Sequence, residues 1–243
     1  THEVAYGGLL HERRHELHAR IVGAIEALHR DRLGEHNDRL AHHALQGERW
    51  EKAVGYLHQV GLRAIARSAN REAVAHLEQA LETLRRLPES RENTEVAIDL
   101  RFELRTALLP LADLARMERH LREAEVLARA LGDQRRLGLA LGGLVMPRMN
   151  AGDWDDAQRS GREALAIAEA LGERPLAMRT MYVLSMVHDV RGEFSQAAAL
   201  LERIVPLLEG DLLYERFGDA SIVSVGSRVY LCDVLSQLGR FDE

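Results

Sequence analysis

The sequence predicts an all-α fold, a right-handed α-solenoid built from antiparallel helix hairpins. The first observation is an internal repeat: residues 152–157 read GDWDDA, and residues 192–197, about 40 positions later, read GEFSQA. The second is composition, because Ala, Leu, Arg and Glu dominate and favour helices, while the chain has only 5 prolines. The third is that no run of alternating β-branched residues indicates a strand. Together these observations favour stacked helices.

A second pair of similar segments has the same spacing. Residues 128–133 read ARALGD and residues 168–173 read AEALGE, at the same offset. A helix pair of this kind cannot bury its apolar face alone, so neighbouring pairs must stack. We expect glycine to form each turn, the ring of Trp154 or Phe194 to fill the gap beneath it, and a following alanine to let two helices approach closely.

Apolar residues at helical spacing predict four helices in the first 90 residues. Gly47, Asn70 and Pro88 mark an expected helix end, N-cap and stop. The expected helices cover about residues 1–31, 38–46, 50–65 and 73–84.

The rest of the chain is predicted to hold a kinked helix and then regular pairs. Ser90 is expected to cap a fifth helix that continues past Pro110 with a kink. The pairs that follow are expected at 119–131 with 134–150, 153–171 with 175–191, and 193–208 with 213–238. We therefore expect about eleven helices in two parts: an N-terminal segment of atypical repeats, 1–90, and a repeat array, 91–243, whose last repeat is cut short.

The glycine–ring–alanine pattern resembles the tetratricopeptide repeat (TPR) family. The period near 40 residues departs from the family's usual length of about 34. The resemblance implies a scaffold that binds proteins or peptides.

A second resemblance covers roughly residues 3–86. It is similar to the segment that follows the ATPase module of large bacterial signalling proteins, which often carry a class III adenylate or guanylate cyclase or a DNA-binding regulator domain. The resemblance implies that residues 1–90 link such an ATPase to the array. The residues that carry it are Val4-Ala5-Tyr6, Leu9-Leu10, Arg13-Arg14, Leu17-His18, Ala27-Leu28, Ala41-His42, Ala53, Tyr56-Leu57, Ala64, Ala69-Asn70, Ala73 and Ala80-Leu81.

Charge and composition restrict the partners. A net charge of -6 argues against nucleic-acid binding. No apolar run approaches the roughly 20 residues that span a bilayer, so no membrane partner is expected. The single cysteine, Cys232, fits a reducing, cytoplasmic location, and its apolar neighbours predict a buried, inert thiol.

No catalytic motif or cofactor site is evident, so we expect this region not to be an enzyme. A phosphate-binding loop needs a lysine after glycines, and the only lysine, Lys52, begins a helix. His11, His15 and His18 share a helix face that could hold zinc, which leaves a metal-dependent helical enzyme as an alternative. A solvated Arg- and His-rich face is the simpler explanation, since no closed ligand set is visible.

Methionines supply the one pattern that resembles a binding site. On the TPR pattern, two successive first helices direct a set of side chains toward the concave surface, where flexible thioethers suit an adaptable peptide groove. The set is Met146, Met149, Asn150, Arg179, Tyr182, Met186 and Asp189. Core packing is the alternative, most of all for Met178 and Met181.

The function we expect is a non-catalytic interaction or regulatory region of a multidomain signalling protein. Its partner would be a protein, a peptide or a neighbouring domain, and the alternative to this role is a peptide-binding TPR receptor. Since Thr1 is not Met and residues 239–243 repeat the turn phrase, we expect a piece of a longer protein. We also expect self-association through apolar residues near the C-terminus: Leu231, Val234, Leu235 and Leu238.

Overall fold

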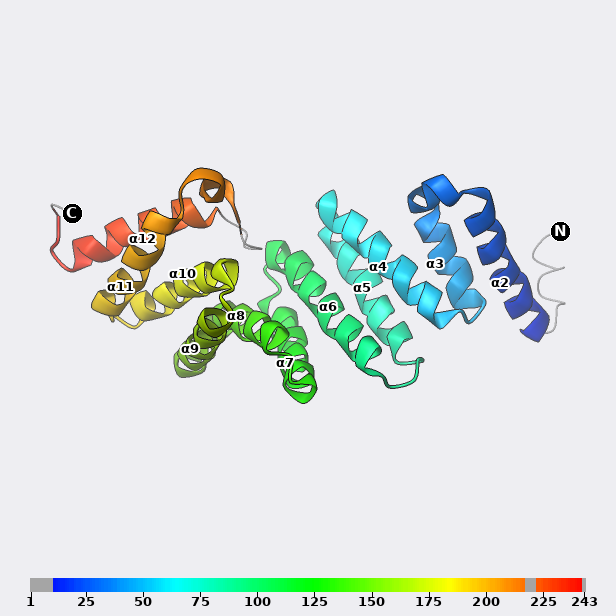
Figure 1. Ribbon diagram of the computed structural model, residues 1–243, viewed down its shortest axis with the longest axis horizontal. Helices are drawn as coiled ribbons and strands as arrows, with labels where there is room; N and C mark the ends of the chain where they lie inside the picture. Colours follow the sequence, from blue (N-terminus) through cyan, green and yellow to red (C-terminus); the bar gives the residue numbers. More distant parts are fainter. Residues whose placement is uncertain (1–10, 217–221, 242–243) are drawn as a thin grey trace. The chain divides into compact units, whose positions relative to one another are not determined.

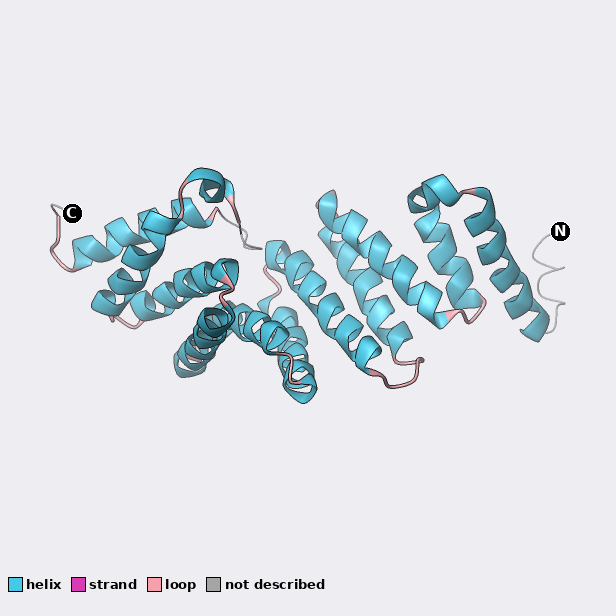
Figure 2. Cartoon of the chain, viewed as in Figure 1, coloured by secondary structure: helices cyan, strands magenta, loops and turns pink. Residues whose placement is uncertain are grey.

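The computed structural model describes residues 11–216 and 222–241, apart from the side chains of residues 11 and 12. Helices joined by short loops make up this part of the chain (Figures 1 and 2). It contains eleven α-helices, labelled α2 to α12, and no strand, which confirms the all-α prediction. The chain divides into two compact units, Thr1–Ala107 and Leu108–Glu243. The functional boundary expected between residues 90 and 91 stays a prediction.

The first unit is a succession of amphipathic helices in which α2 contacts α3, α3 contacts α4, and α4 contacts α5. Its core includes Val22, Leu40, Leu57 and Leu77, which are almost completely buried. Because apolar residues recur every three or four positions, each helix presents one apolar face to its neighbour. The elements are α2 His11–Leu28, a 3-10 segment Arg30–His36, α3 Asn37–Gln46, α4 Trp50–Ala66, α5 Asn70–Leu84 and α6 Arg91–Leu108.

Gly47, at the end of α3, lets α2 pack directly against the α3–α4 turn. A Cβ at this position would lie 2.7 Å from the backbone nitrogen of Ala19. The same region holds a small core of Val22, Ile25 and Leu40. A glycine therefore sets the distance between α2 and the rest of the unit.

Several predicted ends in this unit differ from the structure. The first helix ends at Leu28 rather than at residue 31, and its expected start at residue 1 lies outside the described residues. Asn70 is the first residue of α5 rather than its cap; Ala69 is the N-cap and offers no side-chain hydrogen bond. Ser90 caps α6 as predicted, because its Oγ accepts a hydrogen bond from the Asn93 backbone nitrogen at 3.1 Å.

The prediction that the fifth helix continues past Pro110 is wrong. Helix α6 ends at Leu108 and a 3-10 turn, Leu109–Leu111, follows. Ala112 then adopts a φ of 54°, and the carboxylate of Asp113 accepts a hydrogen bond from the Arg116 backbone nitrogen. A new helix, α7, therefore begins at Leu114 instead of residue 119.

The second unit carries the regular hairpins. Successive helices contact one another, and α8 also contacts α10, as α10 contacts α12. The proline at position 147 lies inside α8 without ending it. The elements are α7 Leu114–Leu131, α8 Gln134–Ala151, α9 Trp154–Leu171, α10 Arg174–Val190, α11 Phe194–Ile204, 3-10 segments Val205–Leu207 and Gly210–Tyr214, and α12 Val223–Gln237.

Two turns show why the repeat phrase contains glycine. Gly152 and Gly192 have φ values of 85° and 72°, in the left-handed region that side chains disfavour. The residue after each donates its backbone N–H to the preceding helix: Asp153 to the Arg148 carbonyl at 2.9 Å and Glu193 to the His188 carbonyl at 2.8 Å. These bonds satisfy helix-end carbonyls and reverse the chain.

The alanine part of the pattern is confirmed, whereas the ring part is only half correct. The alanines that end the two phrases, Ala157 and Ala197, are completely buried. Phe194 packs against the core of the unit. Trp154, in contrast, is 44% exposed and does not fill the space beneath its turn.

The last predicted pair is also revised. In place of one helix at 213–238, a 3-10 segment ends at Tyr214 and α12 begins at Val223, with residues 217–221 outside the described part. Val234 and Leu235 are buried by the chain itself, while Leu231 and Leu238 are half-buried. The apolar residues expected to be uncovered therefore largely face the interior.

Asp133 is the N-cap of α8, and its hydrogen bonds predict how much this helix end contributes to stability. Its carboxylate accepts hydrogen bonds from the Arg136 backbone nitrogen at 2.9 Å and from Arg136 Nη1 at 2.8 Å. Burial alone would raise the pKa of Asp133, but these bonds from Arg136 outweigh burial and lower it. Asp133→Ala is expected to lower the free energy of unfolding by about 1 kcal/mol at neutral pH.

The lowered pKa of Asp133 sets the pH dependence of this effect. Stabilisation by an acid of lowered pKa is complete above its unfolded pKa, about 3.9, and is lost as pH falls through the folded value. Urea unfolding at pH 7 and pH 3 measures the difference between variant and wild type, which should shrink at pH 3. Asp153→Ala is the matched control, because Asp153 is the N-cap of α9 but makes no capping bond. An equal loss in both variants would contradict the prediction.

Candidate functional site

The predicted binding residues come from α8 and α10, two helices that contact each other. Asn150 is exposed, and four others are half-buried: Met146, Met149, Met186 and Asp189. Arg179 and Tyr182 are instead buried, at 6% and 3% exposure. The structure thus leaves five of the seven predicted side chains open to a partner, and their role in binding stays a prediction.

Tyr182 is covered by α12. Its ring lies edge-on to the ring of Tyr230, with centroids 6.1 Å apart. Gly226 faces its hydroxyl so closely that a Cβ at Gly226 would overlap it. Tyr182 therefore holds α10 against α12 rather than lining a surface.

The methionines divide between core and surface. Met178 and Met181 are buried, as the core-packing alternative expects. Met149 and Met186 are only partly buried against the same core cluster. Flexible thioether side chains at the edge of a packed core can adapt to different partners.

Asp189 gives this face an acidic edge. Burial raises the pKa of its carboxyl, and the nearby carboxylate of Asp233 on α12 raises the pKa further. A cationic group of a partner placed here would relieve the repulsion between the two acids.

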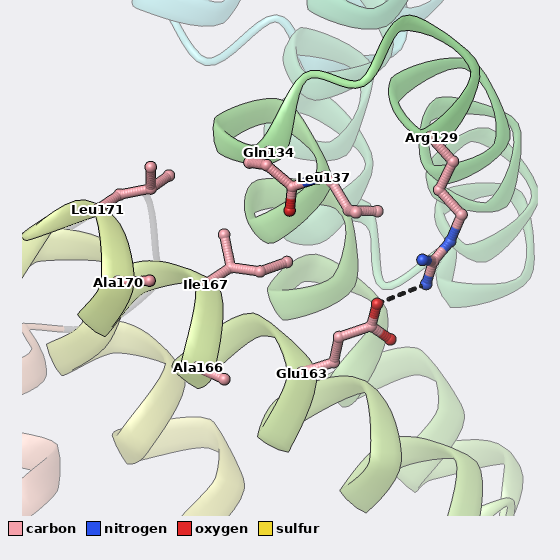
Figure 3. Close-up of a pocket in the computed structure, with 8 residues that line it drawn as sticks. All are labelled: Arg129, Gln134, Leu137, Glu163, Ala166, Ile167, Ala170 and Leu171. Carbon is pink, nitrogen blue, oxygen red and sulfur yellow. Dashed lines mark hydrogen bonds and ion pairs between the residues drawn. The ribbon is translucent and has the colours of Figure 1, made fainter.

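Figure 3 shows a hollow between the end of α7, the start of α8 and the second half of α9. Its volume is about 480 Å³. Leu137 from α8 and Ile167 and Leu171 from α9 form its apolar wall, together with Ala166 and Ala170 (Figure 3). Leu171 is exposed, and the hollow is therefore open to a partner's apolar side chain.

An ion pair closes one side of the hollow. Arg129 Nη2 donates to Glu163 Oε1 at 2.8 Å (Figure 3). The same nitrogen also donates to Glu125 Oε1 at 3.1 Å. The hydrogen bond to Glu163 is the main reason that the pKa of Arg129 is raised. The hollow therefore has an apolar wall with one charged border.

Sequence reasoning did not find this hollow. Its signal is that Ala170 and Leu171, which are exposed, continue the apolar positions of α9 beside Ile167, which packs against Gly138 of α8. An apolar residue left over from a helix's core face can mark an interaction site.

Lys52 is held in a polar cluster of the first unit. Its Nζ donates to Glu26 Oε1 at 2.8 Å and to Glu26 Oε2 at 2.7 Å, and the Tyr56 hydroxyl donates to the same carboxylate. Burial and then Glu26 raise the pKa of the Tyr56 hydroxyl. These bonds tie α2 to α4.

The histidines of α2 and α3 pack against one another. His18 Nδ1 lies 2.7 Å from His43 Nδ1, and the His42 ring centroid lies 5.2 Å from that of His43. His15 lies 3.4 Å from Glu48 Oε1, whereas the side chain of His11 is outside the described part. Among the residues described, no group of three or more His, Cys, Asp or Glu could hold a metal ion. His18 and His43 form a packing contact between α2 and α3.

This contact predicts that acid loosens α2. Burial lowers the pKa of both His18 and His43. The charges of His42 and His15 lower the pKa of His18 further, and those of His18, His42 and Arg39 lower the pKa of His43 further. A histidine whose folded pKa is lowered stabilises the fold fully above its unfolded pKa, about 6.5, and stability falls as pH drops below it. Amide hydrogen exchange in α2, corrected for intrinsic exchange rates, should therefore be faster at pH 5.5 than at pH 7.5. His18→Gln should remove most of this pH dependence, and an unchanged dependence would contradict the prediction.

Cys232 is exposed, so the prediction of a buried thiol is wrong. It lies on the side of α12 opposite Val234, which is in the core. Within the ranges described, no helix is long and apolar enough to cross a bilayer.

Comparison with known families and curated proteins gives one match. Residues 136–210 match the tetratricopeptide repeat family. This segment runs from the first turn of α8 to the 3-10 segment after α11 and includes both complete turn phrases. No curated protein matches the chain.

Several solved structures share the fold. BtubC from P. vanneervenii superposes with a TM-score of 0.66 at 14% identity, over 96% of this chain and 86% of that one. A Signal Transduction ATPase with Numerous Domains from Pyrococcus horikoshii, with a tetratricopeptide repeat sensor, gives 0.65 at 12% identity, over 98% and 35%. The Rap conjugation gene regulator of plasmid pLS20, in complex with the Phr* peptide, gives 0.61 at 16%, over 82% and 51%. This chain is therefore a TPR-like helical repeat region.

Proposed function

We propose that this chain is a non-catalytic interaction and regulatory region of a multidomain signal-transduction protein, an ATPase with a nucleotide cyclase or a transcription regulator as output. The observation that carries the proposal is the hollow beside α9, because six of its eight lining residues lie within residues 136–210, which match the TPR family. The ATPase with a repeat sensor supports it, because that structure superposes on 98% of this chain. A partner protein or a neighbouring domain would bind in the hollow and against the half-buried methionines of α8 and α10, which are Met146, Met149 and Met186.

The regulatory mechanism follows from how repeats pack. Each helix pair contacts its neighbours, so a partner that binds several repeats favours one set of inter-repeat angles over another. The partner's differential affinity for the two sets would then bias the attached ATPase. The array would transmit binding energy without taking part in catalysis.

The test uses the parent protein and its nucleotide-dependent output. Leu171→Asp places a charge in the hollow at an exposed position, so the fold is kept while partner-dependent ATP hydrolysis should be lost. Leu207→Asp is the matched control, since Leu207 is also exposed but does not line the hollow. If neither Leu171→Asp nor deletion of residues 108–243 changes regulated ATP hydrolysis, the proposal is wrong.

A peptide-binding receptor is the second candidate, supported by the half-buried Met149 and Met186 and by the Rap regulator that holds a peptide. A peptide at 100 times its Kd would stabilise the folded chain by about 2.7 kcal/mol and raise its melting temperature. Met186→Asp should abolish the rise. Alanine at Arg179 or Tyr182 would not test the groove, because both side chains are buried and their loss would disturb the fold.

A further inference from the structure

The ion pair that borders the hollow is one end of a chain of charged side chains. Arg129 Nη2 contacts two carboxylates, that of Glu163 on α9 and that of Glu125 on α7. Glu125 serves two arginines with different oxygens, because Oε1 accepts from Arg129 while Oε2 lies 3.6 Å from Nη2 of Arg148 on α8. The side chain of Arg129 is 45% exposed and that of Arg148 is 10% exposed, so the chain runs from the surface into the interior. We call these four residues the charge network: Glu163, Arg129, Glu125 and Arg148.

Arg148, the buried end of the charge network, is incompletely satisfied. Its Nη1 donates to the Ser160 hydroxyl on α9, but among the described residues its Nε has no hydrogen-bond partner. Glu118 Oε1 lies 3.9 Å from this Nε, which is beyond hydrogen-bond distance. A buried guanidinium needs compensating negative charge. Any change in how Glu125 is shared therefore changes how firmly Arg148 is held.

Arg148 lies in the last turn of α8, beside Met149 and Asn150 of the candidate binding set. The backbone ties this turn only loosely to the rest of the helix, because Pro147 has no N–H to donate to the Gly143 carbonyl. Helices α7 and α9 both pack on α8. The side chain of Arg148, which reaches both of them, therefore anchors a turn whose own helix holds it weakly.

Arg129 is shared between two acids, so the charge network contains a competition. While Glu163 attracts Arg129 toward α9, Glu125 stays available to Arg148. When the charge of Glu163 is neutralised, Arg129 pairs with Glu125 alone. The attraction between Glu125 and Arg148 then weakens, because the carboxylate moves toward the competing guanidinium. Glu163 is open to neutralisation by a basic group, since its side chain is 39% exposed and shares its arginine with another acid.

We propose that the partner in the hollow carries a basic side chain beside its apolar anchor, and that pairing of this side chain with Glu163 loosens the last turn of α8. The hollow and the half-buried methionines of α8 are then coupled, because occupation of the first disorders the turn that carries Met149. The inference rests on the proposed function for the existence of a partner. It adds the chemistry of that partner and the sign of the coupling between two surfaces.

Amide hydrogen exchange of residues 148–151, measured on the 243-residue chain, tests the coupling without a partner. Glu163→Gln removes the charge that a basic side chain would neutralise, and it should speed exchange of these amides about threefold. Arg129→Gln should instead slow their exchange, because Glu125 is then left to Arg148 alone. Opposite effects from the two members of one ion pair distinguish this coupling from a simple loss of stability.

Glu169→Gln is the matched control. Glu169 accepts a hydrogen bond from Arg203 at 2.8 Å, the same distance as between Arg129 and Glu163, and it lies on the same helix as Glu163. In the part of the chain that the structure describes, the Glu169–Arg203 pair makes no ion pair with α8. Exchange of residues 148–151 should therefore equal that of wild type. Circular dichroism confirms that each variant keeps its helices.

Two model peptides test the chemistry of the partner. Both are amphipathic helices of leucine, one with lysine and one with glutamate on the polar face. The lysine peptide should speed exchange of residues 148–151 in the wild-type chain, and the glutamate peptide should not. Leu171→Asp makes the surface more acidic but places a charge in the hollow, so it should abolish the effect of the lysine peptide if binding needs the hollow.

Several results overturn the proposal. In the variants these are unchanged exchange in Glu163→Gln, faster exchange in both Glu163→Gln and Arg129→Gln, or an equal increase in Glu169→Gln. With the peptides they are no effect of the lysine peptide up to about 1 mM, an equal effect of the glutamate peptide, or an equal effect on Leu171→Asp.

The ATP-hydrolysis test separates this inference from the proposed function. If Leu171→Asp abolishes partner-dependent hydrolysis while Glu163→Gln leaves exchange unchanged, the coupling is wrong and the proposed function stands. In the reverse case the proposed function is wrong, and the coupling between the hollow and the last turn of α8 stands.

Discussion

Arg148→Met is expected to lower the free energy of unfolding of the second unit by about 3 kcal/mol, the largest effect of any single change considered. Arg148 is a buried arginine on α8. Its Nη1 donates to the Ser160 hydroxyl on α9, its Nη2 lies 3.6 Å from Glu125 and its Nε lies 3.9 Å from Glu118 on α7. One side chain therefore joins three consecutive helices.

The size of this effect depends on which ion pairs Glu118 and Glu125 retain when Arg148 is replaced. Removing one member of a buried ion pair leaves the other charge without compensation, which destabilises by about 3–5 kcal/mol. Here Arg122 and Arg129 still pair with Glu118 and Glu125, so the lower end applies. Methionine preserves most of the side-chain volume, which separates the loss of charge from the loss of packing.

Urea unfolding followed by circular dichroism measures the change. Arg159→Met is the control, because Arg159 pairs with Asp156 at 2.7 Å on the surface, where such pairs contribute about 0–1 kcal/mol. A loss of under about 1 kcal/mol in Arg148→Met would mean that Arg148 only fills space.

Gly47→Ala is expected to release α2 from the first unit. The added Cβ would lie 2.7 Å from the Ala19 nitrogen and 3.1 Å from its Cα, and neither backbone atom can yield without moving α2. Separation would uncover Val22 and Ile25, which are otherwise almost fully buried. Overpacking of this kind destabilises by about 1–3 kcal/mol.

Hydrogen exchange read helix by helix distinguishes local release from a general loss of stability. Protection should fall most in α2, with α4 and α5 little changed. Gly23→Ala is the control on α2 itself, where a Cβ would meet no atom within 4 Å and should stabilise the helix by about 0.5–1 kcal/mol. Undiminished protection of α2 in Gly47→Ala would show that the contact is not limiting.

The sequence predicted hairpins well where local signals act together. Residues 134–150, 153–171 and 175–191 were expected to be helical. Helices α8 and α9 differ from these ranges by one residue at one end, and α10 differs by one residue at both ends. Each has an apolar stripe, and a glycine of positive φ caps α8 and α9 or directly follows the cap of α10. These signals lie within a few residues, so no knowledge of distant contacts is needed.

Prediction failed where two signals competed or where contacts are distant. The start of α7 was missed because the apolar spacing continues across Pro110, while Asp113 caps a new helix. Tyr182 fits a groove pattern, yet its exposure depends on where α12 lies, and Gly226 on that helix is the only local sign of the close contact. The hollow beside α9 was missed because it arises from the gap between α9 and the end of α7, which spacing along one helix does not describe.

The turns at Gly152 and Gly192 have the same backbone hydrogen bond, and this bears on how repeat chains gain or lose repeats. The backbone closes in the same way at both corners, so excision of residues 153–192 would connect α8 to α11 through an unaltered joint. Unequal recombination could thus add or remove whole modules without requiring any new side chain. Related polypeptides would then differ in how many modules they string together while each joint stays the same.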